Sequence, residues 1–204
     1  MDRRQWFDRL AGTWDALFTE DITARLHEII ADLDIKPGAR VLDVGCGTGV
    51  LAPMLLERLD QDRSVVALDI SPEMLKAAQQ KGHPIQYVLA DGQSLPVPDH
   101  SFDWVICNAV FPHFLDKVSV LREVHRVLKA GGQLLICHPE GRETVNATHR
   151  ELGAPVCSDL VPGEDEMRKL LSAANLDHAH VCDVPERYVV RASRPACDTE
   201  EQAG

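Results

Sequence analysis

The sequence lacks the features that would place it on a membrane or on nucleic acid. No apolar run approaches the roughly 18 residues of a membrane span. The opening stretch MDRRQWFDRL is charged where a signal peptide is apolar. No run of Lys and Arg forms a basic stripe, and the formal net charge of -11 would repel a phosphate backbone. We therefore expect a cytoplasmic protein that binds neither a membrane nor nucleic acid.

The sequence also lacks a cysteine framework. None of its 6 cysteines are arranged as CxxC, so we expect free thiols. Cys46, Cys107 and Cys137 fall at or near the ends of strands that should be neighbours, where they would suit a soft metal. Buried cysteine is more commonly a small apolar residue, and we predict no metal site. With no internal repeat and no low-complexity linker, the 204 residues are expected to form a single domain.

Helical and strand patterns alternate along most of the chain. Apolar residues recur at helical spacing over 6–18 and again over 22–33. Strands are then expected at 41–44, 64–69, 85–90, 102–107 and 133–138, with helices between them and after them. These strands are almost continuously apolar, as in a parallel sheet covered by helices on both faces. Two last strands, 178–183 and 187–192, should pair as an antiparallel hairpin at the sheet edge. The predicted fold is α/β, with a doubly wound, mostly parallel sheet.

Three glycines follow the first of these strands. Gly45, Gly47 and Gly49 permit a tight turn into a helix and let a ligand approach the backbone closely. A dinucleotide would fit such a turn, because Gly47, Gly49 and Ala52 match a shifted GxGxxA pattern. Asp43 favours another ligand, since its negative charge would repel a pyrophosphate and attract a ligand with an ammonium and a sulfonium group.

Acidic residues also end the second and third strands. Asp69 lies about twenty residues after the glycines, where a carboxylate can accept hydrogen bonds from both ribose hydroxyls. Asp91, followed by Gly92 and Gln93, is placed to accept a hydrogen bond from an adenine amino group. Because ligands of such sheets bind beyond the carboxyl ends of the strands, acids at three successive strand ends predict a nucleoside site.

Four blocks of sequence occur in order: LDVGCGTG, ALDIS, LADGQSLPVPDHSFDWVICNAVFPHF and LREVHRVLKAGGQLLI. Together they resemble the class I S-adenosylmethionine-dependent methyltransferases, in the small-molecule branch with ubiquinone/menaquinone-type motifs. The resemblance covers residues 36–138 and implies a Rossmann-like domain that binds S-adenosylmethionine and releases S-adenosylhomocysteine. It implies that the glycine turn and Asp43 hold the methionine part, Asp69 the ribose, and Asp91 with Gly92 the adenine. The full set of expected cofactor contacts is Asp43, Gly45, Cys46, Gly47, Gly49, Asp69, Ile70, Asp91, Gly92, Gln93 and Asn108.

The resemblance also marks candidates for the chemistry. Asn108, at the end of the fourth strand, matches a position that lines the methyl-transfer site. Many relatives have a His-His pair where this chain has Pro112 and His113, so only the second histidine carries over as a catalytic candidate. His149 is a further candidate base. A phenol or an amine would need a base, whereas a thiolate or a carboxylate attacks as it stands.

The segment after the fifth strand is expected to face the acceptor. In a helix, Arg142, Asn146 and His149 would share one polar face near His138. A guanidinium on that face would suit an anionic acceptor, because it pairs with a carboxylate through two hydrogen bonds. Trp14 is expected to approach the acceptor from the N-terminal side.

The single domain is therefore expected to divide into four parts. Residues 1–35 form a helical lid, 36–138 the cofactor-binding core, 139–192 the acceptor-side helices and edge strands, and 193–204 a frayed tail. The predicted function is methyl transfer from S-adenosylmethionine to a small-molecule acceptor by in-line displacement. The missing first histidine supports an alternative, a non-catalytic S-adenosylmethionine-binding module that serves a protein partner. A nicotinamide dehydrogenase is a third reading. The oligomeric state is not predicted.

Overall fold

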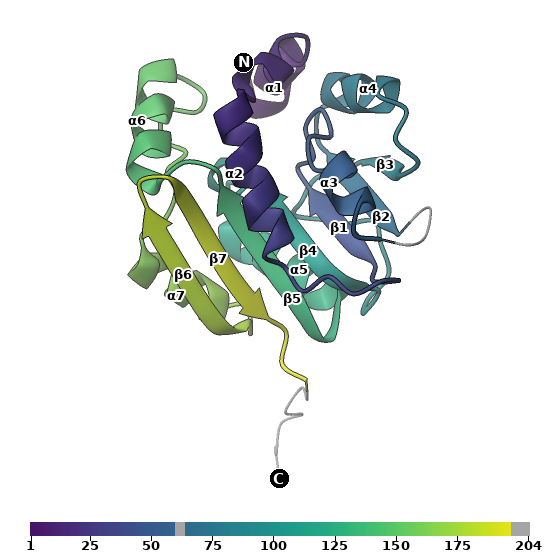
Figure 1. The fold of residues 1–204 in the computed structure, drawn as a ribbon. Helices are drawn as coiled ribbons and strands as arrows, with labels where there is room; N and C mark the ends of the chain where they lie inside the picture. The colour runs from purple at the N-terminus through teal and green to yellow at the C-terminus, as the bar shows by residue number, and fades with distance from the viewer. Residues whose placement is uncertain (60–63, 197–204) are drawn as a thin grey trace.

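A computed structural model describes residues 1–59 and 64–196. Its centre is a seven-stranded sheet with the order β3-β2-β1-β4-β5-β7-β6 (Figure 1). The strands are β1 (Val41–Val44), β2 (Val65–Asp69), β3 (Gln86–Leu89), β4 (Phe102–Asn108), β5 (Leu128–His138), β6 (Asp177–Val184) and β7 (Arg187–Ser193). Strands β1 to β5 pair in parallel, whereas β7 runs antiparallel to both β5 and β6. This arrangement confirms the predicted fold class and the C-terminal hairpin, with β6 at the edge.

The helices cover both faces of the sheet (Figure 1). They are α1 (Arg3–Leu10), α2 (Glu20–Ala31), α3 (Ala52–Leu56), α4 (Pro72–Gln80), α5 (Lys117–Val127), α6 (Arg142–Leu152) and α7 (Glu164–Ser172), with 3-10 turns η1 (Trp14–Leu17) and η2 (Phe111–His113). Short polar side chains start several of them. The side chains of Thr19, Ser71 and Asp116 accept hydrogen bonds from backbone N–H groups in the first turns of α2, α4 and α5.

The core lies on both sides of the sheet because its central strands are apolar on both faces. All four residues of β1 are buried. Leu42 and Val44 pack in the cluster that contains Val124 of α5, whereas Val41 packs in the cluster that contains Leu26 of α2. Alternate residues of one strand thus contact opposite helical layers, as a doubly wound sheet requires.

Several element boundaries differ from the sequence prediction, three of them in the helices. The helical pattern over 6–18 is interrupted, because α1 ends at Leu10 and the chain turns at Gly12 before η1. Glycine is a poor helix former, so this break has a local cause. The helix expected to run through Leu59 ends at Leu56, and the helix expected to run through Leu128 ends at Val127, where β5 begins.

The expected start of the tail at residue 193 is also wrong. Ser193 is the last residue of β7, and Arg194 is buried, with its guanidinium donating to the carbonyl of Leu128 at 3.0 Å. Residues 197–204, the rest of the expected tail, lie outside the described residues. Over the described ranges, no helix combines the length and the apolar character needed to cross a bilayer.

Candidate functional site

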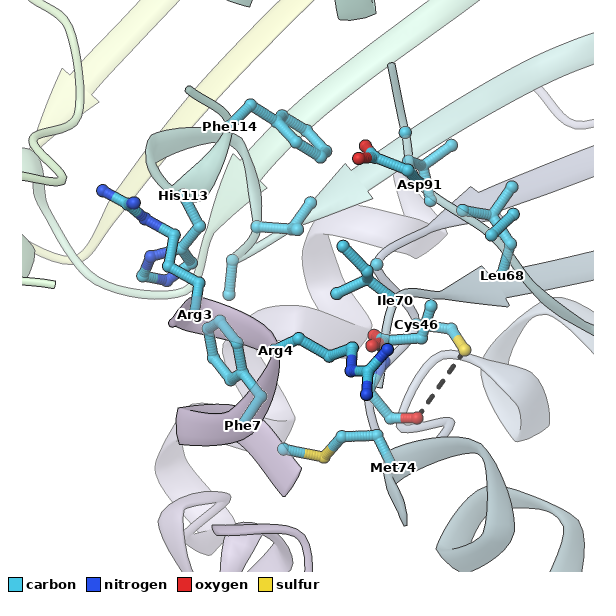
Figure 2. Close-up of a pocket in the computed structure, with 18 of the residues that line it drawn as sticks. Arg3, Arg4, Phe7, Cys46, Leu68, Ile70, Met74, Asp91, His113 and Phe114 are labelled. Carbon is cyan, nitrogen blue, oxygen red and sulfur yellow. Dashed lines mark hydrogen bonds between the residues drawn. The ribbon is translucent and has the colours of Figure 1, made fainter. Parts of the chain in front are cut away.

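A cavity of about 470 Å³ lies at the carboxyl ends of the strands, beneath α1 (Figure 2). This volume is within the range of roughly 300 to 1,000 Å³ that small-molecule sites occupy. Nine of the predicted cofactor contacts line it: Gly45, Cys46, Gly47, Asp69, Ile70, Asp91, Gly92, Gln93 and Asn108. Of the other predicted contacts, Asp43 and Gly49 are not in the lining. The strand ends therefore meet around one space, as the sequence predicts.

The turn after β1 has a backbone conformation that favours glycine. Gly45 and Gly47 have φ angles of +73° and +54°, in the left-handed region. The backbone N–H groups of Gly45 and Cys46 donate to the carbonyl of Leu68 at 2.8 and 2.9 Å, which fixes the turn against β2. A Cβ on Gly47 would lie 3.4 Å from Nε1 of Trp14. The N-terminal segment therefore packs close to the turn.

Asp69 organises the same turn from the end of β2. Its Oδ2 accepts a hydrogen bond from Gly47 N at 2.9 Å, and its Oδ1 accepts one from Ser71 N at 2.8 Å. Burial raises the pKa of the Asp69 carboxyl, although these backbone hydrogen bonds oppose the shift. A carboxylate oxygen has two lone pairs, so Asp69 can still accept hydrogen bonds from ligand hydroxyls in the cavity.

Asp43 lies beneath the turn and is 2% exposed. Its Oδ1 has no hydrogen-bond partner among the residues that the structure describes. Burial, together with the negative charge of Asp69, raises the pKa of Asp43 to about 8. A cationic ligand bound above the turn would favour the ionised form of this carboxyl. This unpartnered buried acid fits a cofactor that carries a sulfonium and an ammonium group.

The other end of the cavity offers an acid beside apolar surfaces. Asp91 Oδ1 accepts a hydrogen bond from Gln93 N at 2.9 Å, which holds its carboxylate at the strand end. A Cβ on Gly92 would lie 2.8 Å from the ring of Phe114, so this ring packs directly on the backbone. Ile70 and Leu115 are 40% and 75% exposed and contribute apolar surface to the lining. The Asp91 carboxylate can accept a hydrogen bond from the amino group of adenine, and the apolar side chains beside it suit the flat faces of the ring.

Helix α1 lies over this edge of the sheet, between α6 and α4 (Figure 1). It is attached on both sides. Asp8 Oδ1 accepts a hydrogen bond from Ser71 Oγ at 2.6 Å, at the start of α4. Arg3 Nε donates to Asp159 Oδ2 at 2.9 Å, in the loop between α6 and α7. No residue of α1 is fully buried. A covering helix held by polar contacts is consistent with the expected lid, whose movement stays a prediction.

The α1 side chains fill different parts of the cavity. Arg3, Arg4 and Phe7 all contribute to its lining. In Figure 2, Arg3 lies beside His113, whereas Arg4 extends toward Cys46 at the glycine turn. Trp14 also lines the cavity. Phe7 belongs to the apolar face of the expected lid, whereas Arg3 and Arg4 were not expected from the sequence.

His113 in η2 faces the cavity and has a carboxylate partner. Its Nδ1 lies 2.9 Å from Asp159 Oδ2, and its ring centroid lies 5.0 Å from that of Phe7. Burial lowers the pKa of His113, although the hydrogen bond to Asp159 opposes the shift. Burial alone would raise the pKa of Asp159, but its hydrogen bonds with His113 and Arg3 outweigh that effect and lower it to about 2. Asp159 is another residue that the sequence analysis missed, because it follows no motif.

The predicted acceptor face of α6 has other contacts. Arg142 Nε donates to Asp183 Oδ2 at 2.7 Å, on β6. Asn146 bonds to both backbone groups of Val161, and His149 Nδ1 bonds to the backbone oxygen of Asp159. None of the three predicted residues is in the cavity lining. The prediction that they contact an acceptor is therefore corrected, since their polar groups are engaged by β6 and by the loop that follows α6.

His138 and Asn108 end neighbouring strands but have different positions. His138 is 3% exposed, lies outside the cavity lining and has no partner for Nε2 among the described residues. Burial, with the nearby His113 and His149, lowers its pKa to about 3. Its predicted substrate contact is therefore corrected. Asn108 does line the cavity, and its Oδ1 accepts a weak hydrogen bond from Cys137 Sγ at 3.5 Å.

The three strand-end cysteines are not arranged as a metal site. Within residues 1–59 and 64–196, no group of three or more His, Cys, Asp or Glu side chains could hold a metal ion. Burial raises the pKa of the Cys46, Cys107 and Cys137 thiols, and the charge of Asp43 adds to this. These thiols are therefore protonated at neutral pH.

Comparison with known proteins points to one family. Residues 42–136 match a family model described as a methyltransferase domain. The chain is 33% identical over 138 residues to a demethylmenaquinone methyltransferase of Listeria welshimeri, which covers 63% of this chain and 58% of the relative. It is 39% identical over 110 residues to the ubiquinone/menaquinone biosynthesis C-methyltransferase UbiE of Xanthomonas campestris, which covers 51% of this chain and 44% of the relative. The chain thus matches only about half the length of these relatives.

The fold is also similar to that of a solved structure. A chain in the solved complex between the Haloferax volcanii Trm112 methyltransferase activator and a methyltransferase superposes with a TM-score of 0.78 and 21% identity. The superposition covers 96% of this chain and 99% of that one. The matched domain, the four sequence blocks and the strand order make the chain similar to the class I S-adenosylmethionine-dependent methyltransferases, whose cofactor is S-adenosylmethionine.

Proposed function

We propose that the protein transfers a methyl group from S-adenosylmethionine to a small, flat, largely apolar acceptor of the quinol type. The observation that carries this proposal is the composition of the cavity. The strand-end acids Asp69 and Asp91 lie in the same cavity as Phe7, His113 and Phe114. The site therefore offers polar partners for a nucleoside and, beside them, an aromatic surface with one imidazole.

We assign the cofactor to the strand ends. Asp69 would accept the ribose hydroxyls, and Asp91 the adenine amino group. Ile70 and Gly92 would contact the adenine faces, and Arg4 would pair with the methionine carboxylate at the glycine turn. Bound there, S-adenosylmethionine supplies an electrophilic methyl group on a positively charged sulfur, and S-adenosylhomocysteine is the product.

The acceptor would lie between Phe7, Phe114 and His113. Aromatic edges and faces favour a planar ring, and the apolar neighbours Val110 and Pro155 complete this part of the lining. The names of the two relatives, which act in menaquinone and ubiquinone biosynthesis, support an acceptor of the same class. The earlier expectation of an anionic acceptor loses its main support, because Arg142 is paired with Asp183 outside the cavity.

His113 is the base that this geometry supports best. Its Nδ1 faces Asp159, which leaves Nε2 for a ligand in the cavity. A carboxylate accepts hydrogen bonds only, so a neutral His113 carries its proton on Nδ1 and has a free lone pair on Nε2. The lowered pKa of His113, caused mainly by burial, keeps the ring neutral at physiological pH. His113 can therefore take a proton from an acceptor hydroxyl. His149 does not share this role, because its Nδ1 is bonded to the backbone oxygen of Asp159 and the residue is not in the cavity lining.

Turnover assays test the proposal directly. The purified protein would be incubated with S-adenosylmethionine carrying an isotopic methyl label and with reduced 1,4-naphthoquinone, under anaerobic conditions. We expect S-adenosylhomocysteine and labelled naphthoquinol in equal amounts, and neither product with His113→Ala. Release of unlabelled S-adenosylhomocysteine without a labelled, methylated quinol would exclude the acceptor class and leave the cofactor assignment intact.

A second candidate function has one observation in its favour. The fold is closely similar to a chain solved in complex with a methyltransferase activator, so a protein partner is a real alternative to a free small-molecule enzyme. A non-catalytic S-adenosylmethionine-binding module would bind S-adenosylhomocysteine tightly and yield no methylated product from quinol, phenol, amine or thiol pools. Product from any of these pools would exclude it.

A further inference from the structure

We propose that Asp159 and Arg3 are positioning residues for His113, and that docking of α1 through Arg3 sets the proton affinity of the imidazole. The inference deepens the proposed function, since it rests on His113 as the base. It concerns three side chains from three separate parts of the chain. Arg3 comes from α1, His113 from η2, and Asp159 from the loop between α6 and α7.

One carboxylate joins the other two groups. Asp159 Oδ2 lies 2.9 Å from His113 Nδ1 and accepts a hydrogen bond of 2.9 Å from Arg3 Nε, while Arg3 also donates through its terminal nitrogen to Oδ1. The Asp159 side chain is 4% exposed and that of His113 is 9% exposed, so water competes little for these contacts. A two-point contact between guanidinium and carboxylate fixes the plane of the carboxylate as well as its position.

The backbone on each side of this cluster is also held. Lys117 Nζ donates to the carbonyls of Pro112 and Phe114, both at 3.1 Å, and so braces the turn that carries His113. On the other side, His149 Nδ1 bonds to the carbonyl of Asp159. Asn146 bonds to Val161 two residues farther along the same loop. The helix expected to contact the acceptor therefore holds the carboxylate that orients His113.

Charged and titratable groups surround His113 on every side that packs against it. Arg3 faces it from α1, Asp159 from the loop, His149 from α6 with ring centroids 4.9 Å apart, and His138 lies nearby at the end of β5. Lys117, on α5, adds positive charge near Asp159. Within this set Asp159 favours the protonated imidazole, whereas Arg3 and His149 disfavour it. Arg3 is the only one of these groups that lies on α1, so movement of α1 would bring its charge to Asp159 or remove it.

Two consequences follow for the acceptor's proton. With α1 docked, Asp159 holds the Nδ1–H tautomer and points Nε2 toward the cavity, and the charge of Arg3 limits how strongly Asp159 raises the proton affinity of the ring. Nε2 can then accept the proton that an acceptor hydroxyl loses and release it to solvent afterwards. Without the contact between Arg3 and Asp159, the positive charge of Arg3 no longer offsets the carboxylate, and the pKa of His113 rises.

Opposite shifts in the pKa of His113 test this coupling without any acceptor. The pKa and the tautomer would be measured by two-dimensional NMR of the ¹⁵N-labelled imidazoles in the full chain, with His113→Gln used to assign the signal. We expect Asp159→Asn to lower the pKa of His113 and Arg3→Met to raise it. Arg9→Met, an exposed change on the same helix, should leave it unchanged. If Asp159→Asn and Arg3→Met shift the pKa in the same direction, the coupling is excluded and the cluster only packs the lid.

Kinetics with reduced 1,4-naphthoquinone then separate positioning from binding. We expect Asp159→Asn to lower kcat by about 10²-fold, a typical value for loss of general-base assistance, with an unchanged Kd for S-adenosylhomocysteine. The acid limb of the kcat/KM profile should move to higher pH in Arg3→Met. An unchanged kcat in Asp159→Asn would overturn the positioning role. Opposite NMR shifts in the two variants, together with no turnover by the wild-type protein, would instead leave the coupling intact and reject the proposed function.

Discussion

Asn146 and Val161 exchange two hydrogen bonds across the loop that follows α6. Val161 N donates to Asn146 Oδ1 at 2.7 Å, and Asn146 Nδ2 donates to the Val161 carbonyl at 3.3 Å. Both contacts are buried, so the side-chain amide of Asn146 satisfies two backbone groups that water does not reach. This residue is therefore a structural support for the Asp159 loop.

Asn146→Ala should destabilise the protein without weakening the cofactor. Leaving a buried backbone group unpaired costs about 1 to 3 kcal/mol. We expect a loss of this size in urea unfolding, with an unchanged Kd for S-adenosylhomocysteine. Thr148→Ala, an exposed change on the same helix, is the matched control and should change stability little. Unchanged stability in Asn146→Ala together with a raised acceptor KM would restore the original acceptor role.

Gly45→Ala tests the packing of the turn. A Cβ at Gly45 would lie 2.3 Å from Cγ2 of Val110, and the φ angle is +73°. Gly38 has a similar φ of +79° but open space around a Cβ, so Gly38→Ala isolates the backbone cost, roughly 1 to 2 kcal/mol. We expect Gly45→Ala to lose a further 1 to 3 kcal/mol or so from overpacking, measured by urea unfolding. Adding Val110→Ala should recover much of that further loss, and equal losses in the two single alanine variants would argue against the overlap.

Asp43 should make stability fall as pH rises. Burial beside Asp69 raises the pKa of Asp43 from 3.8 to about 8, so between these pH values the native state holds a proton that the unfolded state has lost. The free energy of unfolding therefore decreases through this window as pH increases. Asp43→Asn keeps the shape and removes the titration. Urea unfolding from pH 5 to 8.5 should show that the stability of this variant relative to wild type rises steadily, and parallel curves would contradict the assignment.

The Arg4→Gln variant tests whether Arg4 binds the carboxylate of the cofactor and not its nucleoside. Arg4 Nε lies 4.0 Å from Asp8 Oδ2 in α1, and the Arg4 side chain is 56% exposed, so little holds the guanidinium in place without a ligand. We expect Arg4→Gln to weaken S-adenosylhomocysteine by about tenfold, in line with roughly 1.5 kcal/mol for a hydrogen bond to a charged group. Binding of methylthioadenosine, which has no carboxylate, should not change. Calorimetry on Arg4→Gln and on Arg9→Gln would measure both, and equal weakening of the two ligands would assign Arg4 to the nucleoside or to the fold.

The sequence predicts the sheet and the cofactor edge well because both depend on local patterns. Apolar runs ending in Asp43, Asp69 and Asp91 mark strands and their carboxyl ends at once, and the parallel topology brings those ends together. The glycine turn is equally local, since its positive φ angles favour glycine. Nine of the eleven expected cofactor contacts accordingly line one cavity.

The acceptor side could not be predicted in the same way. Helical spacing places Arg142, Asn146 and His149 on one face, but spacing does not say what that face contacts. The contacts are tertiary: Asp183 comes from β6 and Asp159 from a loop without a motif. Likewise, the period of α1 marks an amphipathic helix and gives no reason to expect Arg3 beside a carboxylate that lies 156 residues away in the chain.

The most direct test of the account is calorimetric titration of the folded wild-type protein with S-adenosylhomocysteine. We predict saturable binding at one site per chain, weakened in Asp69→Ala by about 1.5 to 3 kcal/mol through loss of charged hydrogen bonds to ribose. We also predict no competition from NAD. Absence of binding by protein that circular dichroism shows to be folded, or displacement of S-adenosylhomocysteine by NAD, would contradict the assignment of the strand ends to this cofactor.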